Sequence, residues 1–294
     1  MRAKCVAVLE GKNMDKEIAC VTGYKDKSPL FMKEDKSYCG DLRRACASRP
    51  GYTELDIVRI VQYCINKGVD VNTVFDYGKS FLFYACSNGQ ADSAKILLEA
   101  GADINARTSW GVSAFDFSCR RGYTEVVKIL LQHGACNDLQ RQLRLACSLG
   151  FLDLVKLFIE EGADIDDTYS GSGTILMMSC RHRYNELFTH LLLKGANVNL
   201  TDSIGYSPLY YACARNNVGM VKSLIENGAN VNHSTEFGAT ALRIACCLGN
   251  AKIVQLLLEQ KVDLTTVNSV GHTALTSAHM SGRDDIVELL EKEV

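Results

Sequence analysis

The sequence predicts an all-α repeat solenoid, in which helix-turn-helix units stack side by side and short β-hairpin-like fingers join each unit to the next. Three observations lead to this fold class. Glycine-containing phrases of one kind recur every 33 residues, a hydroxyl residue precedes each first helix, and an amphipathic stretch follows it. Because a fixed period of roughly 20 to 50 residues is typical of stacked repeats, the period decides how each residue is interpreted.

The period is visible in seven phrases such as AGADIN and NGANVN. They are separated by 33, 33, 28, 33, 33 and 33 residues, and their glycine register lies at Gly68, Gly101, Gly134, Gly162, Gly195, Gly228 and Lys261. A cysteine slot follows the same spacing, at Cys86, Cys119, Cys147, Cys180, Cys213 and Cys246, with Cys46 in an irregular first unit and His279 in the last. The sequence therefore predicts a repeat domain over residues 39–294, with about eight units including a capping unit at each end.

Each regular unit begins with a hydroxyl residue that can cap a helix. Its side chain accepts a hydrogen bond from a free N–H group of the first turn. Proline is favoured at the first helical position, where Pro208 follows Ser207. The predicted caps are Ser80, Ser113, Thr174, Ser207, Thr240 and Thr273.

The second helix of each unit is predicted from its apolar periodicity. The stretches EVVKILLQHG (125–134) and AKIVQLLLEQ (251–260) have the 3.6-residue spacing of a helix with one buried face. The glycine that follows most of these helices suits a left-handed C-cap. The next residues are rich in Asp, Asn, Ser and Gly, which favours a turn and hence the finger.

The interval of 28 residues predicts an irregular joint between Gly134 and Leu143. Here HGACNDLQRQLRLACSLG (133–150) leads from one helix to the next without a finger, and Arg141 stands at the cap position. We expect loss of the hydroxyl cap to cost about 1 kcal/mol. We also expect a notch or bend in the row of fingers, although a shortened loop without a role explains the same deletion.

Residues 1–38 do not follow the period and are predicted to be a separate, non-repeat segment. CVAVL (5–9) and IACVT (18–22) suggest two short strands, and a charged, linker-like stretch follows them. A capping hairpin, a disordered arm and a partner-binding tail remain open. The first repeat unit carries about seven extra residues around 49–55 and is expected to be an N-terminal cap.

The helix, turn, helix, finger unit resembles the ankyrin repeat, most closely in SPLYYA (207–212), with GANVN and LLLEQ nearby. The resemblance covers roughly residues 40–294. The histidine of the family's TPLH motif is absent throughout, so its hydrogen bonds to neighbouring fingers are expected to be lost. The replacing residues are Phe83, Asp116, Arg144, Met177, Tyr210, Arg243 and Thr276.

The resemblance also explains the cysteine slot, because the family places a second small residue where helices of adjacent units press together. Cysteine is a small and commonly buried residue. Neighbouring slots are expected roughly 8 to 10 Å apart, too far for a disulfide. A linear array also fails to converge on one zinc ion. We therefore expect reduced cysteines that serve in packing, with no metal site and no cofactor.

Enzymatic signatures are absent from the sequence. It lacks GxxxxGK[ST], GxGxxG, HExxH and GxSxG, so we expect no enzyme. The formal net charge of −2 gives no overall bias toward nucleic acid. No apolar stretch is long enough for a signal peptide or a membrane span, so an intracellular protein is expected, in the cytoplasm with the nucleus also open.

The resemblance implies a protein-protein interaction module or adaptor, monomeric, that binds a partner protein through its finger tips and the concave face of its first helices. Aromatic residues are expected in equivalent positions at the finger tips, either free to bind or packed on the adjacent finger. These are Tyr77, Trp110, Tyr206 and Phe237.

A row of cationic residues is expected along the concave side, where it would attract an acidic or phosphorylated segment. The alternative is a set of solvated helix ends. Two other functions remain open: a nucleotide or RNA ligand on this row, and a pathogen effector or host-range factor that captures a host protein. The residues of the row are Arg120, Arg121, Arg181, His182, Arg183 and Arg215.

Overall fold

A computed structural model describes residues 36–46, 54–135, 138–168, 171 and 173–293. The strands expected before residue 36 and most of the insertion around residues 49–55 lie outside this part. The chain divides into two compact units, an N-terminal unit (1–137) and a C-terminal unit (138–294). The boundary falls in the joint that the 28-residue interval marks.

The described part of the N-terminal unit contains six α-helices and one short 3₁₀ turn, η2 (Asp76–Gly78). The first helix begins three residues before the predicted start of the repeat domain. The helices are α2 (Lys36–Cys46), α3 (Glu54–Asn66), α4 (Phe81–Ser87), α5 (Ala91–Glu99), α6 (Ala114–Arg121) and α7 (Thr124–Gln132).

The C-terminal unit continues the same alternation of two helices per repeat. Its helices are α8 (Leu139–Leu149), α9 (Leu152–Glu160), α10 (Ile175–His182), α11 (Asn185–Leu193), α12 (Pro208–Ala214), α13 (Val218–Glu226), α14 (Ala241–Leu248), α15 (Ala251–Leu258), α16 (Ala274–Met280) and α17 (Asp284–Glu291). No helix of the described residues has the length and hydropathy that a membrane crossing requires.

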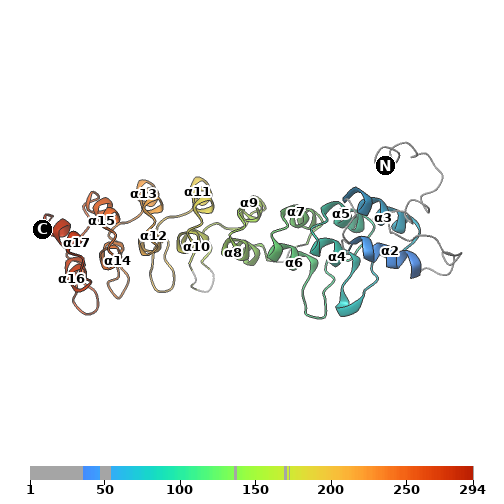
Figure 1. Cartoon of the computed structure of the whole chain (residues 1–294), viewed down its shortest axis with the longest axis horizontal. Coiled ribbons are helices and arrows are strands. Elements are labelled where there is room, and N and C mark those ends of the chain that lie inside the picture. Colours follow the sequence, from blue (N-terminus) through green and yellow to red (C-terminus); the bar gives the residue numbers. More distant parts are fainter. Residues whose placement is uncertain (1–35, 47–53, 136–137, 169–170, 172, 294) are drawn as a thin grey trace, which may run out of the picture. The chain divides into compact units, whose positions relative to one another are not determined.

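Within each unit the helices form two layers (Figure 1). We call the even-numbered helices α2 to α16 the inner helices, because the fingers extend from their ends. The odd-numbered helices α3 to α17 are the outer helices. In the N-terminal unit α4 packs on α2 and α6, and in the C-terminal unit α12 packs on α10 and α14. Each inner helix also packs on the outer helix that follows it, for example α12 on α13. The predicted all-α repeat architecture is confirmed.

All six predicted hydroxyl caps stand at helix N-termini, and each side chain accepts a hydrogen bond from the backbone N–H three residues later. Ser113 also forms a capping box, because the Asp116 carboxylate accepts from the Ser113 backbone N–H. The fingers are short. Three of them are closed by a single antiparallel bridge, at Val74 and Ser80, Arg107 and Ser113, and Ser234 and Thr240.

The cysteine slot lies in the core. Its members are at most 1% exposed, and burial raises the pKa of most of these thiols above the ordinary value near 9. Their packing role follows from this burial. Among the described residues, no group of three His, Cys, Asp or Glu side chains is placed to hold a metal ion. The slot residues are Cys46, Cys86, Cys119, Cys147, Cys180, Cys213 and Cys246.

A polar ladder joins successive repeats at the turns that follow the outer helices. The Oδ1 atom of Asn199 accepts a hydrogen bond of 2.7 Å from the Asn230 backbone N–H, and its Nδ2 atom donates to the Gly228 carbonyl. Asn72 makes the same two bonds to Asp103 and Gly101. The Asx residues predicted as turn formers therefore also link one repeat to the next.

The joint without a finger departs from the expectation of a lost cap. The α8 helix begins before Arg141, and the Asp138 carboxylate accepts a hydrogen bond of 2.9 Å from the Arg141 N–H. The hydroxyl cap is absent as predicted, but the expected cost is wrong, because the shortened chain brings an acidic residue that caps the helix instead. The notch or bend in the finger row stays a prediction.

Gln140 takes the place of the ladder asparagine at this joint. Its Oε1 atom accepts from the Asp164 N–H at 2.9 Å, and its Nε2 atom donates to the Asp164 carbonyl at 2.6 Å. One helical turn later, Arg144 forms an ion pair with Asp167. Gln140, a longer side chain on α8, thus makes the contact to the next turn that an asparagine such as Asn199 makes in the regular repeats.

We expect Gln140→Ala to lower the free energy of unfolding of the C-terminal unit by about 1 to 2 kcal/mol, because both bonds to Asp164 are lost. Gln140→Asn should recover little of this, since the shorter side chain does not reach. Urea unfolding followed by circular dichroism measures the effect. Asn199→Ala, which breaks the regular ladder, is the matched comparison. An unchanged midpoint for Gln140→Ala would contradict a linking role.

Candidate interaction surfaces

The finger tips of the N-terminal unit carry a stacked aromatic pair. The rings of Tyr77 and Trp110 lie 5.0 Å apart at an interplanar angle of 20°. A hydrogen bond of 2.8 Å from the Ser109 N–H to the Tyr77 carbonyl holds the two fingers together. The residues remain 63% and 62% exposed. Trp110 therefore packs on the adjacent finger and still offers most of its surface to solvent.

Lys79 belongs to the same surface. Its Nζ atom lies 5.8 Å from the Trp110 ring, 5.7 Å from Tyr84 and 6.0 Å from Phe83. Such distances are typical of cation-π contacts. Lys79 therefore connects the Trp110 ring at the finger tip with the Phe83 and Tyr84 rings on the inner helix α4.

The inner-helix face of this unit continues with Phe117 and the last turn of α6. The Phe83 and Phe117 rings meet edge to face at 5.4 Å. The Arg121 guanidinium lies over Phe117 at 5.3 Å, and Arg120 is exposed beside it. Both arginines end a helix, where cations interact favourably with the helix dipole.

In the C-terminal unit, Tyr206 does not occupy the finger-tip position that Trp110 occupies in its own repeat. Counted back from the cap, Phe237 corresponds to Trp110, and Ile204 rather than Tyr206 is the next equivalent residue. Phe237 and Ile204 are 61% and 52% exposed. The interpretation of Tyr206 as a fourth equivalent finger-tip aromatic is wrong, because it lies one residue before the cap Ser207 and two beyond the tip.

Tyr206 instead belongs to a cluster of three tyrosines. Its ring stacks on Tyr210 at 4.1 Å and 16°, and Tyr211 meets Tyr210 edge to face at 6.1 Å. The Tyr211 hydroxyl donates a hydrogen bond of 2.6 Å to Asp202 Oδ2. Burial, with smaller contributions from Tyr206 and Asp202, raises the pKa of Tyr210 and of Tyr211 to about 12. Both hydroxyl groups are therefore protonated and neutral at physiological pH.

The predicted cations of the C-terminal unit lie at the ends of α10 and α12. Arg181 and His182 form the last turn of α10, and His182 stacks on Tyr184 at 5.5 Å. Arg183 ends this helix in the left-handed conformation, with φ of 61°, where most other repeats have glycine. Arg215 is the exposed C-cap of α12.

The cations that were expected in a single row thus form two groups, one in each compact unit. Arg120 and Arg121 lie in the N-terminal unit, and the other four lie in the C-terminal unit. Within the described part of the chain, none of these six side chains is in an ion pair. Their charge is therefore available to a ligand in each unit separately.

Sequence reasoning missed three further residues on the inner helices: Tyr210, Tyr211 and Arg243. They lie three or four residues after their caps, where the side chains are half-buried beside the fingers. Tyr210 and Arg243 stand where the TPLH motif has histidine, so this departure was the available signal. It was interpreted only as the loss of a hydrogen bond, whereas the replacing side chains form a new surface.

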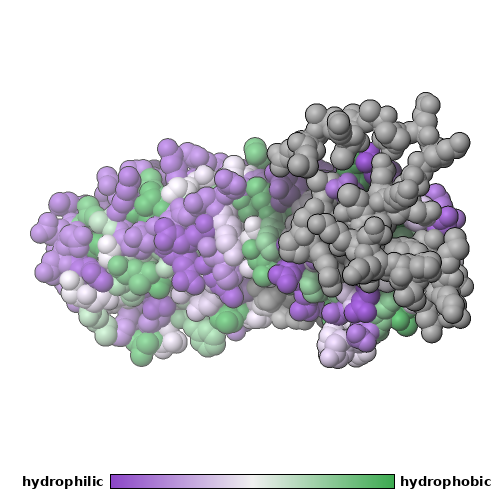
Figure 2. Space-filling model, turned by 45° about the vertical axis from the view of Figure 1, so that its right-hand side comes forward, coloured by the Kyte–Doolittle hydropathy of each residue, from purple (hydrophilic) through white to green (hydrophobic). Residues whose placement is uncertain are grey.

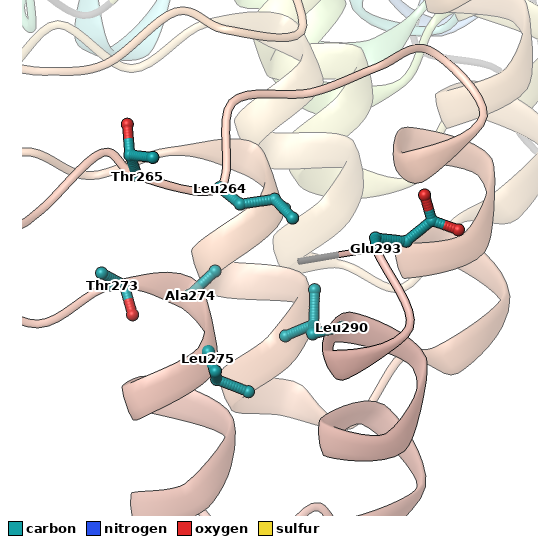
Figure 3. A pocket seen from close by; sticks show the side chains of 7 residues that line it. All are labelled: Leu264, Thr265, Thr273, Ala274, Leu275, Leu290 and Glu293. Carbon is teal, nitrogen blue, oxygen red and sulfur yellow. The ribbon is translucent and has the colours of Figure 1, made fainter.

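A hollow of about 490 Å³ lies beside α16 and α17 (Figure 3). Its wall is mainly apolar, and Glu293 is its one ionisable side chain. Leu264 and Leu275 reach into it from the finger and from α16 (Figure 3). This composition offers neither a catalytic pair nor a set of metal ligands. The lining residues are Leu264, Thr265, Thr273, Ala274, Leu275, Leu290 and Glu293.

The chain was also compared with known proteins. A family model described as ankyrin repeats (3 copies) matches residues 45–108, 106–169, 143–235 and 219–294. The overlapping matches run without a gap from residue 45 to residue 294, well over half of the sequence. A search of curated proteins found no match.

Proposed function

This chain belongs to the ankyrin repeat family, and from that premise we propose that it is an interaction module or adaptor that captures a partner protein on its finger tips and inner helices. Ankyrin repeats generally bind proteins, and the family is typically non-enzymatic. The finer statements concern the surface used and the chemistry of the partner. We expect the module to act as a monomer, in the cytoplasm or the nucleus.

The observation that carries the proposal is the exposed stack of Tyr77 and Trp110. Tryptophan and tyrosine are enriched among the residues that dominate binding energy. Here they are held on fingers tied by a backbone hydrogen bond, so little conformational entropy remains to be lost on binding. A rigid aromatic surface with Lys79 beside it suits an anchor for a partner protein.

The unpaired cations support an acidic or phosphorylated segment in that partner. Charge-assisted hydrogen bonds from arginine to carboxylate or phosphate are stronger than neutral ones. Figure 2 shows mainly hydrophilic side chains over the visible face of the C-terminal unit, with apolar ones in small groups. This pattern fits a partner held by charge and a few anchors rather than by one large apolar patch.

The test is a quantitative pull-down from cell extract with Trp110→Ala, Arg121→Gln and Arg183→Gln combined. We expect partners captured by the unsubstituted chain to be lost, because an anchor and two cations are removed. Helical circular dichroism should be unchanged, since all three side chains lie at the surface. Capture equal to that of the unsubstituted chain would reject these surfaces.

The matched control combines Lys128→Gln with Lys252→Gln. These exposed lysines lie on the outer helices α7 and α15, so the control removes the same number of charges from the opposite layer. Its captured proteins should equal those of the unsubstituted chain. Equal losses in both proteins would point to a general effect of charge instead of the proposed surfaces.

A further inference from the structure

Two arginines flank the tyrosines of α12 in the C-terminal unit. Arg181 on α10 lies close enough to the Tyr211 hydroxyl to act on it electrostatically, and Arg243 on α14 does the same at the Tyr210 hydroxyl. The three helices are neighbours, since α12 packs against both of the others. We call these four residues the Arg-Tyr strip. It crosses three consecutive inner helices.

Arg243 is the least satisfied member of the strip. Its side chain is half-buried, and its Nε atom is buried without a hydrogen-bond partner. A buried donor without an acceptor destabilises the free protein, and more so when it carries charge. The Nε atom itself is closed to solvent, but the side chain as a whole is only half-buried, so its positive charge still favours a negatively charged ligand at the surface.

One finger carboxylate, Asp202, lies beside the strip and offsets part of its positive charge. Asp202 accepts the hydrogen bond of Tyr211, and Asp167 is paired with Arg144. Within the described residues, no carboxylate lies at ion-pair distance from Arg181 or Arg243. Two guanidinium charges against the one Asp202 carboxylate leave a net positive charge beside two neutral aromatic rings.

The spacing of the strip suits an extended peptide. Neighbouring helices lie roughly 8 to 10 Å apart, so α10 and α14 are separated by about 16 to 20 Å. An extended chain covers that length in about five or six residues. A peptide with anionic side chains at both ends of such a segment reaches both arginines, and a residue between them contacts the tyrosine rings.

We propose that the Arg-Tyr strip binds an acidic segment of a partner protein, with one carboxylate on Arg243, a second on Arg181, and an apolar or aromatic residue between them on Tyr210 and Tyr211. The inference rests on the proposed function and adds the position and chemistry of one binding site. It uses inner-helix residues instead of the finger-tip anchor around Trp110.

The probe is a short fluorescein-labelled peptide with two pairs of glutamates about five residues apart and a leucine between them, measured by fluorescence anisotropy with the full chain. Arg243→Gln and Arg181→Gln should each weaken binding about tenfold, the usual effect of losing one charge-assisted hydrogen bond. Lys252→Gln, on the outer helix α15 of the same unit, should change it less than twofold. A peptide with glutamine in place of glutamate should not bind.

A second readout separates binding from folding. Because Arg243 has no partner for its buried Nε atom in the free protein, Arg243→Gln should leave the melting temperature unchanged or raise it. Arg181 is exposed, so Arg181→Gln provides the same binding test without any change in the core. Weaker peptide binding at an undiminished melting temperature supports a site that is kept for a ligand.

Several results would overturn the inference. They are no binding of the glutamate peptide, equal weakening by Lys252→Gln, or binding only of a version with phosphoserine in place of glutamate. If protein capture persists and the Trp110 variant still abolishes it, the proposed function stands while the strip is rejected. If capture is insensitive to the Trp110 variant as well, the proposed function fails too.

Discussion

Raising the pH from about 8 to about 10 under reducing conditions is expected to destabilise the C-terminal unit strongly. Burial raises the pKa of the Cys147, Cys180 and Cys246 thiols to about 12, and it raises the pKa of Cys213 as well. In the unfolded chain these thiols titrate near 9. Above that value the unfolded state loses protons that the folded state keeps, so stability falls as the pH rises.

The size of this effect follows from linkage. At a pH of about 10, each buried thiol lowers the free energy of unfolding by about 1.4 kcal/mol relative to neutral pH. Four thiols together amount to about 5 to 6 kcal/mol, which is comparable to the total stability of a typical domain. Tyr210 and Tyr211 add to the loss only at higher pH, because their ordinary pKa is near 10.

Guanidinium unfolding at several pH values, with a non-thiol reductant and circular dichroism as the signal, measures this loss. Cys213→Ala should be less stable at neutral pH, yet lose about one quarter less stability between pH 8 and 10, because one buried thiol is gone. Cys247→Ala is the matched comparison, since this half-buried neighbour lies outside the slot. Stability that stays level across this range would contradict the thiol account.

Gly238→Ala is expected to cost about 2 to 4 kcal/mol and to disrupt the contact between two fingers of the C-terminal unit. Gly238 has φ of +67°, a conformation that costs other residues about 1 to 2 kcal/mol. An added Cβ atom would also collide with the Val267 carbonyl oxygen and lie 2.6 Å from the Asn268 Cα atom. Both are backbone atoms, which yield only if the finger moves. The hydrogen bond from the Ser269 N–H to the Phe237 carbonyl would then be lost.

Gly271→Ala provides the matched control in the next finger. This glycine occupies the same position of its repeat, with φ of +80°, but an added Cβ atom would meet nothing within 4 Å. It should therefore show the backbone strain alone, about 1 to 2 kcal/mol. The difference between the two unfolding free energies isolates the contact between fingers. Equal losses would show that this contact contributes nothing.

Sequence reasoning placed the finger-tip surface in part. Trp110, Tyr77 and Phe237 were located from the register and are exposed at finger tips. Tyr206 was grouped with them because it is aromatic and near a finger, although its distance from the cap differs by two residues. That shift moves a side chain from the tip to the helix, where Tyr206 stacks on Tyr210.

The joint near residue 138 shows a second limit. The deletion was located correctly, but its consequence was interpreted as a lost cap. The structure has Asp138 as the cap and Gln140 as the link to Asp164. Neither role follows from the spacing, because each depends on where the shortened chain starts α8 and on how far one side chain reaches.

The repeat period, the hydroxyl caps and the buried cysteine slot were determined by the sequence alone. These three features depend on residues within one repeat or on their strict recurrence, so they can be predicted without coordinates. The pairing of Tyr77 with Trp110, the bonds of Gln140 and the buried Arg243 Nε atom without an acceptor were decided only by the tertiary structure. These contacts join residues about 24 to 33 positions apart or depend on the absence of a partner, and only the packing of one repeat on the next brings such groups together or leaves them alone.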